Sequence, residues 1–216
     1  MDAPRRALVV IDVQQEYFDG ILQIQYPPRD ESLKNIGRAL DVAERDGMPV
    51  VVVQHQFPVG APVFAVGSES WNLHAEIQNR ASQGWKRVVK GNASVFSGTD
   101  VAQWLSDRDV DCITIVGFMT NNCDIATAAA AEELGLGVEL LSDATGAIHI
   151  SNEVGSASAQ QVHETLMVLL HSNFAAVAST EAWITAVEGG QALPKSDLGS
   201  SAIQGRADFP DLAAMA

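Results

Sequence analysis

The sequence predicts an α/β fold, a doubly wound and mostly parallel six-stranded sheet flanked by helices, and two observations carry this prediction. Short apolar runs rich in β-branched residues recur along the chain, mostly without alternation, as is typical of strands covered on both faces. Helical patterns separate these runs, and helices supply the long connections that parallel strands require.

The expected strands are distributed along the whole length of the predicted domain. The first run, residues 7–11, reads Ala-Leu-Val-Val-Ile, and the second, residues 49–53, is a proline followed by four valines. Later runs lie at residues 88–89, 113–116, 138–141 and 175–178. All of them are far shorter than the ~20 apolar residues that a transmembrane helix needs, so the sequence predicts no membrane span.

Helices are expected between the strands, at residues 31–45, 101–106, 122–134, 158–171 and 180–187. Side chains suited to N-caps precede two of them, in Thr99-Asp100 and Ser179-Thr180-Glu181. Three glycines lie where helices should end, namely Gly47, Gly135 and Gly189. These end signals agree with the periodicity.

We expect one domain over residues 1–188, followed by a C-terminal tail at residues 189–216. The tail has weak periodicity, which leaves open whether it is flexible or packs on a neighbouring subunit. The connection at residues 57–83 is long and contains several prolines and glycines, so it is expected to shape a pocket.

The charge balance limits the classes of partner. Lys and Arg total 13 against 27 for Asp and Glu, a formal net charge of -14. No basic cluster with interleaved aromatic residues occurs, so neither nucleic acid nor a membrane is an expected partner. The N-terminus carries two arginines but no apolar run of the signal-peptide kind, and a cytoplasmic location is therefore the default expectation.

The two cysteines, Cys112 and Cys123, are expected to be free thiols. The first begins the strand-like run that leads toward the second. About five extended residues at ~3.3 Å each would hold them roughly 16 Å apart, which is beyond the reach of a disulfide. Free thiols are typical of a reducing compartment.

Three reactive side chains are predicted to meet at one edge of the sheet. Asp12 ends the first strand, Lys90 ends the third, and Cys123 follows the fourth, where a helix begins. Taken singly, each has an ordinary structural explanation: a turn residue, a solvated lysine and a small buried cysteine. Ligands bind outside the carboxyl ends of parallel strands, and a helix N-terminus lowers a thiol pKa, so their joint placement predicts an activated cysteine nucleophile.

The residues before Cys123 predict a second part of the site. Residues 117–123, Gly-Phe-Met-Thr-Asn-Asn-Cys, read as a strand exit, a tight turn and a helix start. Several backbone N–H groups could therefore point toward the target of the thiol and form an oxyanion hole.

Together these motifs resemble those of the isochorismatase-like cysteine hydrolases, which include nicotinamidases, carbamoylsarcosine amidase, and ureidoacrylate and biuret hydrolases. The resemblance rests on Asp12-Val13-Gln14 followed by Phe18, on Lys90, and on Gly117-x-x-Thr120-x-x-Cys123, and it spans residues 7–187. It implies a Rossmann-like fold, an Asp12, Lys90, Cys123 triad, and a homodimer or larger homo-oligomer. It also implies a cis peptide bond between Phe118 and Met119, with the N–H groups of Met119 and Cys123 as oxyanion donors.

The sequence departs from the family pattern at two places. Nicotinamidases bind a metal with an Asp-x-His pair after the second strand, whereas this chain reads Gln54-His55-Gln56. Without that carboxylate His55 and His74 make an incomplete ligand set, so we expect neither a metal nor another cofactor. Asp124 stands where the family has a small apolar residue, and its charge would favour the helix dipole but oppose ionisation of Cys123.

The expected function is hydrolysis of a C–N bond in a small-molecule amide, urea or carbamoyl substrate through a thioester on Cys123. Asp12 would act as acid and base, and Lys90 would supply electrostatic support. The residues expected to bind the substrate are Gln14, Phe18, His55, Phe57, Trp71, Phe96 and Thr120.

Alternative functions remain open from the sequence. One is hydrolysis of a vinyl ether, as in true isochorismatases, through Asp12 without the cysteine. Another is a non-catalytic module that binds a nucleotide or other small molecule, although no G-x-G-x-x-G follows the first strand. A thiol-redox role is disfavoured because Cys123 lacks a C-x-x-C partner.

Overall fold

The structure is a computed structural model that describes residues 3–80 and 84–210. Its centre is a six-stranded sheet in the order β3-β2-β1-β4-β5-β8, and every neighbouring pair is parallel. The strands are β1 (Arg6–Ile11), β2 (Val50–His55), β3 (Lys86–Lys90), β4 (Cys112–Gly117), β5 (Gly137–Leu141) and β8 (Ala176–Ala178). The predicted α/β class and doubly wound parallel sheet are confirmed.

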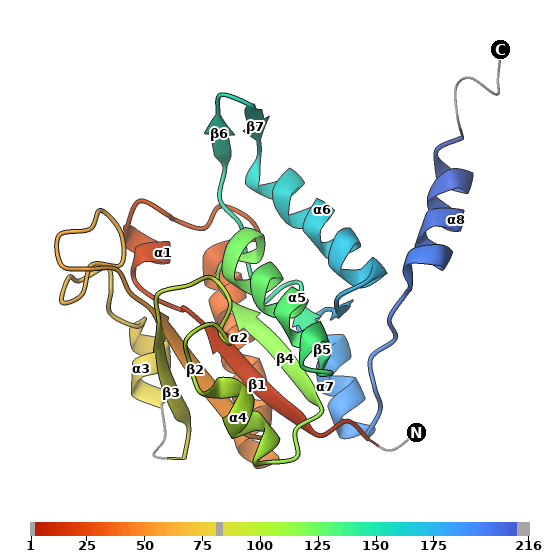
Figure 1. Cartoon of the computed structure of the whole chain (residues 1–216), viewed down its shortest axis with the longest axis horizontal. Helices are drawn as coiled ribbons and strands as arrows, with labels where there is room; N and C mark the ends of the chain where they lie inside the picture. Colours follow the sequence, from red (N-terminus) through yellow and green to blue (C-terminus); the bar gives the residue numbers. More distant parts are fainter. Residues whose placement is uncertain (1–2, 81–83, 211–216) are drawn as a thin grey trace.

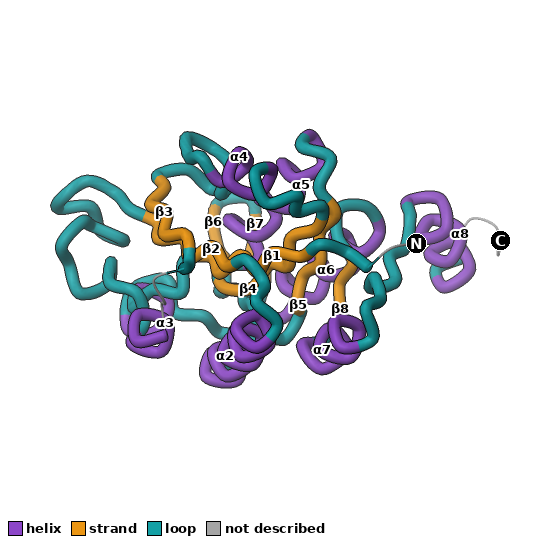
Figure 2. The backbone as a smooth tube through the Cα atoms, turned by 90° about the horizontal axis from the view of Figure 1, so that it is seen from below, coloured by secondary structure: helices purple, strands orange, loops and turns teal. Residues whose placement is uncertain are grey.

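Helices cover both faces of this sheet (Figures 1 and 2). One face is covered by α2 (Arg29–Arg45), α3 (Ala75–Arg80) and α7 (Thr180–Glu188). The other is covered by α4 (Val101–Ser106), α5 (Ile125–Glu133) and α6 (Ala159–Ser172). The chain therefore has the three-layer arrangement expected of alternating strands and helices.

Burial on both faces explains why β1 is apolar without alternation. Leu8 and Val10 belong to the core layer that includes α2 and α7, whereas Val9 and Ile11 belong to the layer that includes α4, α5 and α6. Every residue of β1 is buried. Successive side chains of a strand point to opposite faces, so a central strand needs apolar residues at consecutive positions.

Some elements were not expected from the sequence. These are α1 (Glu16–Asp19), α3, α8 (Leu198–Asp208) in the tail, and an antiparallel hairpin of β6 (Ile150–Asn152) and β7 (Gly155–Ala157) that projects from the sheet layer in Figure 1. The helix expected at residues 122–134 begins instead as a π-helical turn, η1 (Thr120–Asp124), and continues as α5.

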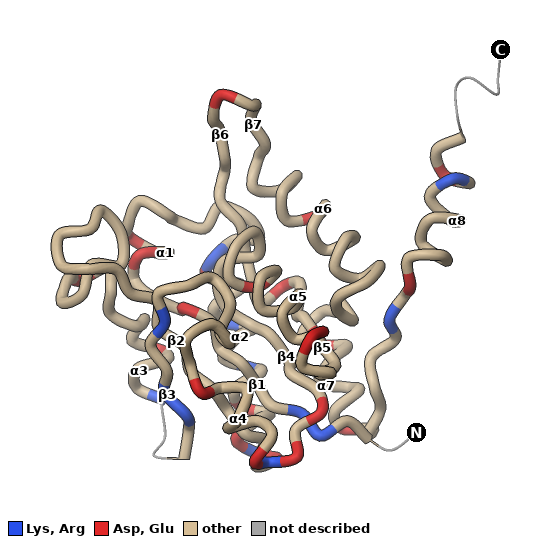
Figure 3. Tube along the Cα trace, in the orientation of Figure 1, with Lys and Arg blue, Asp and Glu red and all other residues tan. Residues whose placement is uncertain are grey.

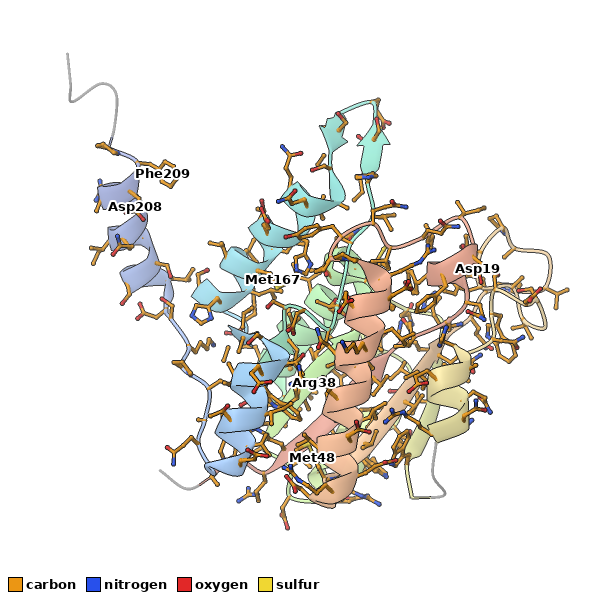
Figure 4. The ribbon with its side chains drawn as sticks, turned by 180° about the vertical axis from the view of Figure 1, so that it is seen from behind. Asp19, Arg38, Met48, Met167, Asp208 and Phe209 are labelled. Atoms are coloured by element: carbon orange, nitrogen blue, oxygen red, sulfur yellow. The ribbon has the colours of Figure 1, made fainter. Side chains whose placement is uncertain are left out.

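The tail contains both a docked segment and a protruding helix. Leu193 is buried in the core layer with α2 and α7, and the Gln191 carbonyl accepts a hydrogen bond from Arg6. Beyond it, α8 (Leu198–Asp208) has no buried residue and extends away from the domain, with Asp208 and Phe209 near its outer end (Figure 4). The first part of the tail thus packs on its own domain.

Charged positions are spread along the described chain. Lys and Arg are interspersed with Asp and Glu and do not form one basic face (Figure 3). None of the helices in the described ranges is both long enough and apolar enough to cross a bilayer.

Candidate active site

The three residues predicted to meet do so at the carboxyl edge of the sheet. Asp12 directly follows β1, Lys90 is the last residue of β3, and Cys123 lies in η1 after β4. Ile11 pairs with Gly117 on one side of β1 and with Val53 on the other, and His55 pairs with Lys90. This register brings the ends of the four strands to the same level of the sheet.

Gly117 lets β4 leave the sheet close to β1. Its φ is 113°, and a Cβ at this position would lie 2.0 Å from the Ile11 carbonyl oxygen. Phe118 then donates a backbone hydrogen bond of 2.8 Å to the same oxygen, and the Phe118–Met119 peptide is cis. The loop that carries Cys123 is thus anchored directly beside Asp12.

The ammonium of Lys90 is the centre of the site. It donates hydrogen bonds to Oδ2 of Asp12 at 2.7 Å and to Sγ of Cys123 at 3.2 Å. It also lies 3.0 Å from Nδ1 of His55 and 3.1 Å from the Asn92 carbonyl oxygen. An ammonium group has three N–H donors and cannot accept a hydrogen bond. The four neighbouring acceptors therefore share three donors, and Nδ1 of His55 must be an acceptor.

The electrostatics of Cys123 differ from the sequence-based expectation. Burial, followed by the charge of Asp12, raises the pKa of the Cys123 thiol well above its usual range, and Lys90 only partly offsets this. The expectation that the helix N-terminus lowers this pKa is wrong, because Cys123 is almost completely buried next to a carboxylate. The thiol is neutral at rest and needs a base to become a nucleophile.

Lys90 and His55 have definite charge states. Burial lowers the pKa of Lys90, but the charge of Asp12 and the hydrogen bonds to Asp12 and Cys123 outweigh burial and hold this pKa above its ordinary value. Burial and the neighbouring Lys90 lower the pKa of His55. The centre therefore contains an ammonium and a neutral imidazole at neutral pH.

A cavity of about 340 Å³ opens on Cys123. Of the residues predicted to bind the substrate, His55 and Phe57 line this cavity. Met119, predicted as an oxyanion donor, lines it as well. Its walls are Tyr17, Leu22, His55, Phe57, Val63, Phe64, Gly91, Asn92, Ala93, Met119, Asn122 and Cys123. None of these residues is Asp, Glu, Lys or Arg.

Gln14 and Trp71 lie outside this lining and brace it instead. The Gln14 side-chain amide donates to the carbonyl oxygens of His55 and Trp71, at 2.9 and 2.7 Å, and accepts from the His55 N–H at 2.8 Å. This fully buried amide fixes the end of β2 against the long connection. Its role in the structure is to position His55.

Three other predicted substrate residues are also outside the lining. Phe18 packs on His74 and Phe118, Phe96 packs on the core layer with α4 and α5, and Thr120 is fully buried among polar side chains. Since aromatic residues are more often core than ligand contacts, the sequence did not separate these roles.

Sequence reasoning missed eight of these lining residues, and four of the eight are polar or aromatic, namely Tyr17, Phe64, Asn92 and Asn122. Two of them carried a signal, because Asn92 follows the strand-terminal Lys90 by two residues and Asn122 directly precedes Cys123. Tyr17 and Phe64 carried none, since their positions depend on the fold of α1 and the long connection.

The backbone near Cys123 offers a donor for an oxyanion. Met119 borders the cavity, and its N–H donates to no acceptor within residues 3–80 and 84–210. Asn122 and Asp124 both donate their N–H groups to the Met119 carbonyl, which holds this turn in place. A carbonyl oxygen bound in the cavity could therefore accept from Met119.

His55 and His74 are the histidines that the sequence analysis considered, and did not favour, as metal ligands. Over the described residues, the candidate ligand atoms that converge belong to Asp12, His55 and Cys123, which lie within 4.8 Å of one another. The Lys90 ammonium already bonds to all three. His74 is not part of this group: its ring packs on Phe18 and its Nδ1 accepts from the Glu76 N–H.

Comparison with known proteins identifies the family. The sequence model of the isochorismatase domain matches residues 6–182 of this chain. The chain belongs to the isochorismatase family. As a member of this family it is a hydrolase, and its parallel sheet and helix layers are those of its isochorismatase-like structural neighbours.

Individual relatives agree with this assignment. The crystal structure of a protein classed as an isochorismatase from Burkholderia xenovorans LB400 is 47% identical, with a TM-score of 0.93 over 97% of this chain and 100% of that one. The isochorismatase family protein YecD of Escherichia coli O157:H7 is 30% identical over 87% of this chain and 98% of its own length. Nicotinamidase 3 of Arabidopsis thaliana is 24% identical over 78% of this chain and 82% of its own length.

Proposed function

We propose that this isochorismatase-family protein is a cysteine hydrolase that cleaves the C–N bond of a small, uncharged amide, urea or carbamoyl compound. One observation carries the proposal: a single ammonium, that of Lys90, contacts both Asp12 and Cys123 beside a small cavity. This arrangement supplies a base, a nucleophile and a cation at one place.

In the first half of the reaction, Asp12 takes the proton from Cys123 as the sulfur attacks the carbonyl carbon of the substrate. The C=O electrons move to the oxygen, which accepts hydrogen bonds from the N–H groups of Met119 and Cys123. The C–N bond then breaks, and protonated Asp12 gives its proton to the departing nitrogen. The products of this half are an amine or ammonia and a thioester on Cys123.

In the second half, Asp12 removes a proton from a water molecule as its oxygen attacks the thioester carbon. The C–S bond breaks, and Asp12 returns the proton to the sulfur. Lys90 remains an ammonium throughout, because its charge favours both the carboxylate of Asp12 and the transient thiolate. The raised pKa of Cys123 makes this base essential, since the thiol does not ionise by itself.

The cavity favours a small and uncharged substrate. A volume of about 340 Å³ is at the small end of ligand sites, and the lining lacks a charged side chain that could pair with a substrate carboxylate. A vinyl ether that carried carboxylate groups would leave those charges unpaired in this cavity. The resemblance to nicotinamidase 3, named for an amide substrate, supports the same choice.

The proposal is tested by screening small amides, ureas and carbamoyl compounds for ammonia release with the wild type and with Cys123→Ser. We expect release with at least one compound and its loss in the variant. The matched control is Cys112→Ser, because Cys112 is also a buried free cysteine but lies at the opposite end of β4. Equal turnover by wild type and Cys123→Ser would exclude the thioester route and favour a route through Asp12 alone.

A further inference from the structure

Four buried polar side chains extend from the residue after the nucleophile to α6, and the mechanism above uses none of them. The Oγ1 of Thr145 donates to Oδ2 of Asp124, and it lies 3.0 Å from Oγ1 of Thr120. Thr120 Oγ1 in turn lies 3.0 Å from Nδ1 of His163. Asp124 and both threonines are completely buried, and His163 is 3% exposed.

The directions of these hydrogen bonds depend on one another. Each threonine hydroxyl has a single proton, so when Thr145 donates to Asp124, Thr120 must donate to Thr145 and His163 must donate from Nδ1. If Asp124 carries a proton and donates it, every bond can reverse, and Nδ1 of His163 becomes an acceptor. The four groups therefore respond as a unit to one proton.

We propose that Asp124 and His163 hold one exchangeable proton between them through the hydroxyls of Thr145 and Thr120, and that loss of this proton makes Cys123 less reactive. Transfer along the chain conserves protons: Asp124 releases one to Thr145, Thr145 passes its own to Thr120, and Thr120 passes its own to His163. Loss of the proton to water leaves a carboxylate at position 124 beside the sulfur.

The surroundings of Asp124 are suited to such a change. Its Oδ1 is buried and accepts no hydrogen bond in the part of the chain that the structure describes, so the carboxylate is incompletely solvated. Burial raises the pKa of Asp124 to about 7, with Thr145 and Lys90 opposing and Asp12 adding to the shift. The charge at position 124 therefore changes near neutral pH.

Other titratable groups face the two ends of the chain. Those that interact with Asp124 are Asp12, Lys90, Cys123 and Tyr17, and those near His163 are Glu164 and Tyr26. Burial lowers the pKa of His163, while a hydrogen bond with the Ser142 backbone and the charge of Glu164 oppose this. The charge of Asp124 raises the pKa of Cys123, after the larger effects of burial and Asp12.

The experiment measures the rate of alkylation of Cys123 by iodoacetamide from pH 6 to pH 9, followed by mass spectrometry of the peptide that contains it. In the wild type we expect the alkylation rate to rise with pH, and to rise less steeply above an inflection near neutral pH, where the carboxylate of Asp124 forms. Asp124→Asn should remove this inflection and react about three- to tenfold faster at pH 8.5, because a like charge shifts a neighbouring pKa by ~1. An inflection that persists in Asp124→Asn overturns the proposal.

The role of the hydroxyl chain is tested with Thr120→Val. This variant removes the donor to Thr145, so the carboxylate is less stabilised and the inflection should move at least about half a pH unit upward. The matched control is Thr127→Val, since Thr127 is equally buried, lies on α5 close to Asp124 in sequence, and accepts a hydrogen bond from the Val95 N–H. An inflection at the same pH in both variants would exclude the chain through Thr120.

Thermal unfolding of each variant establishes that it is folded over the measured pH range. Because thiol alkylation requires no substrate, its outcome is independent of whether the protein is an amidase. A failure of this inference is thus distinguishable from a failure of the proposed function.

Discussion

The ammonium of Lys90 lies 2.7 Å from Oδ2 of Asp12, and both side chains are completely inaccessible to solvent. Two opposite charges can remain in such a place only if each satisfies the other, since either alone would carry a large desolvation cost. Both the folding of this site and its chemistry therefore require the ion pair of Asp12 and Lys90.

Replacing Lys90 by Met removes the positive charge but keeps a side chain of similar length, so it tests the ion pair separately from packing. The variant leaves Asp12 buried without its counterion, so we expect a loss of about 3–5 kcal/mol in the free energy of unfolding, measured with urea. Hydrolysis should fall at least about a hundredfold. Lys86→Met is the control, because Lys86 pairs with a largely exposed Asp100 and its loss should cost less than about 1 kcal/mol. Equal losses in the two variants would contradict this account.

The contribution of three histidines to stability should decrease when the pH falls from 7 to 5. Burial lowers the pKa values of His55, His74 and His163, so each contributes stability that is present above its unfolded value of about 6.5 and is lost as the pH falls through the folded value. Asp124 acts in the opposite direction. Its pKa is raised to about 7, so its contribution is complete below about pH 4 and is lost as the pH rises through 7.

Asp124→Asn removes the opposing contribution and leaves that of the three histidines. Urea unfolding at pH 5, 6 and 7 should therefore show a steeper dependence on pH in Asp124→Asn than in the wild type. An unchanged dependence in the variant would show that Asp124 is charged throughout the range.

Gly117→Ala should damage the fold more than an alanine at another glycine with positive φ. The new Cβ would lie 2.0 Å from the Ile11 carbonyl oxygen, so the β1 and β4 ends must separate, and we expect a loss of more than about 3 kcal/mol. Gly135 has a φ of 69°, and a Cβ added there would meet no atom within 4 Å, so Gly135→Ala should cost only about 1–2 kcal/mol. Urea unfolding compares the two, and similar midpoints would disprove the importance of close approach at Gly117.

Gln14→Leu tests whether this residue braces the site. The variant removes three hydrogen bonds. Two of them are to the backbone N–H and carbonyl of His55, which lose this partner, whereas the Trp71 carbonyl still accepts from Gln54. At about 1–3 kcal/mol for each unsatisfied group, it should be clearly less stable than Gln54→Leu, which removes one bond to the Trp71 carbonyl. If thermal unfolding ranks the two variants in the reverse order, Gln14 does not have this role.

The sequence predicted the central strands well because burial on both faces leaves an unmistakable composition. Residues 113–116 fall within β4, and residues 7–11 fall within β1. The edge strand β3 was seen only as two valines, since its other positions are basic: Lys86 and Arg87 are at least partly exposed, and Lys90 is buried in the site. The β6–β7 hairpin and α8 could not be predicted, because neither buries an apolar face that would impose a pattern.

The catalytic candidates were predictable for a different reason. Strand ends in a parallel sheet share one edge, so Asp12, Lys90 and Cys123 could be brought together from strand positions alone. The cavity walls were not predictable, because they depend on the path of loops, and a buried polar residue such as Gln14 bonds to the backbone as readily as to a ligand. The burial of Cys123, which reverses the expected direction of its pKa shift, is likewise a property of the packed fold.

Lys90 belongs to β3, the outermost strand on its side of the sheet, with only β2 beside it. Edge strands open locally at a lower free energy than the strands they border. Peeling of this one strand would withdraw the cation while the other five strands stay paired, so we expect heat inactivation to precede the loss of the circular-dichroism signal of the helices. On heating, activity would then be lost before the fold, and this inactivation would be reversible as long as β3 can pair with β2 again.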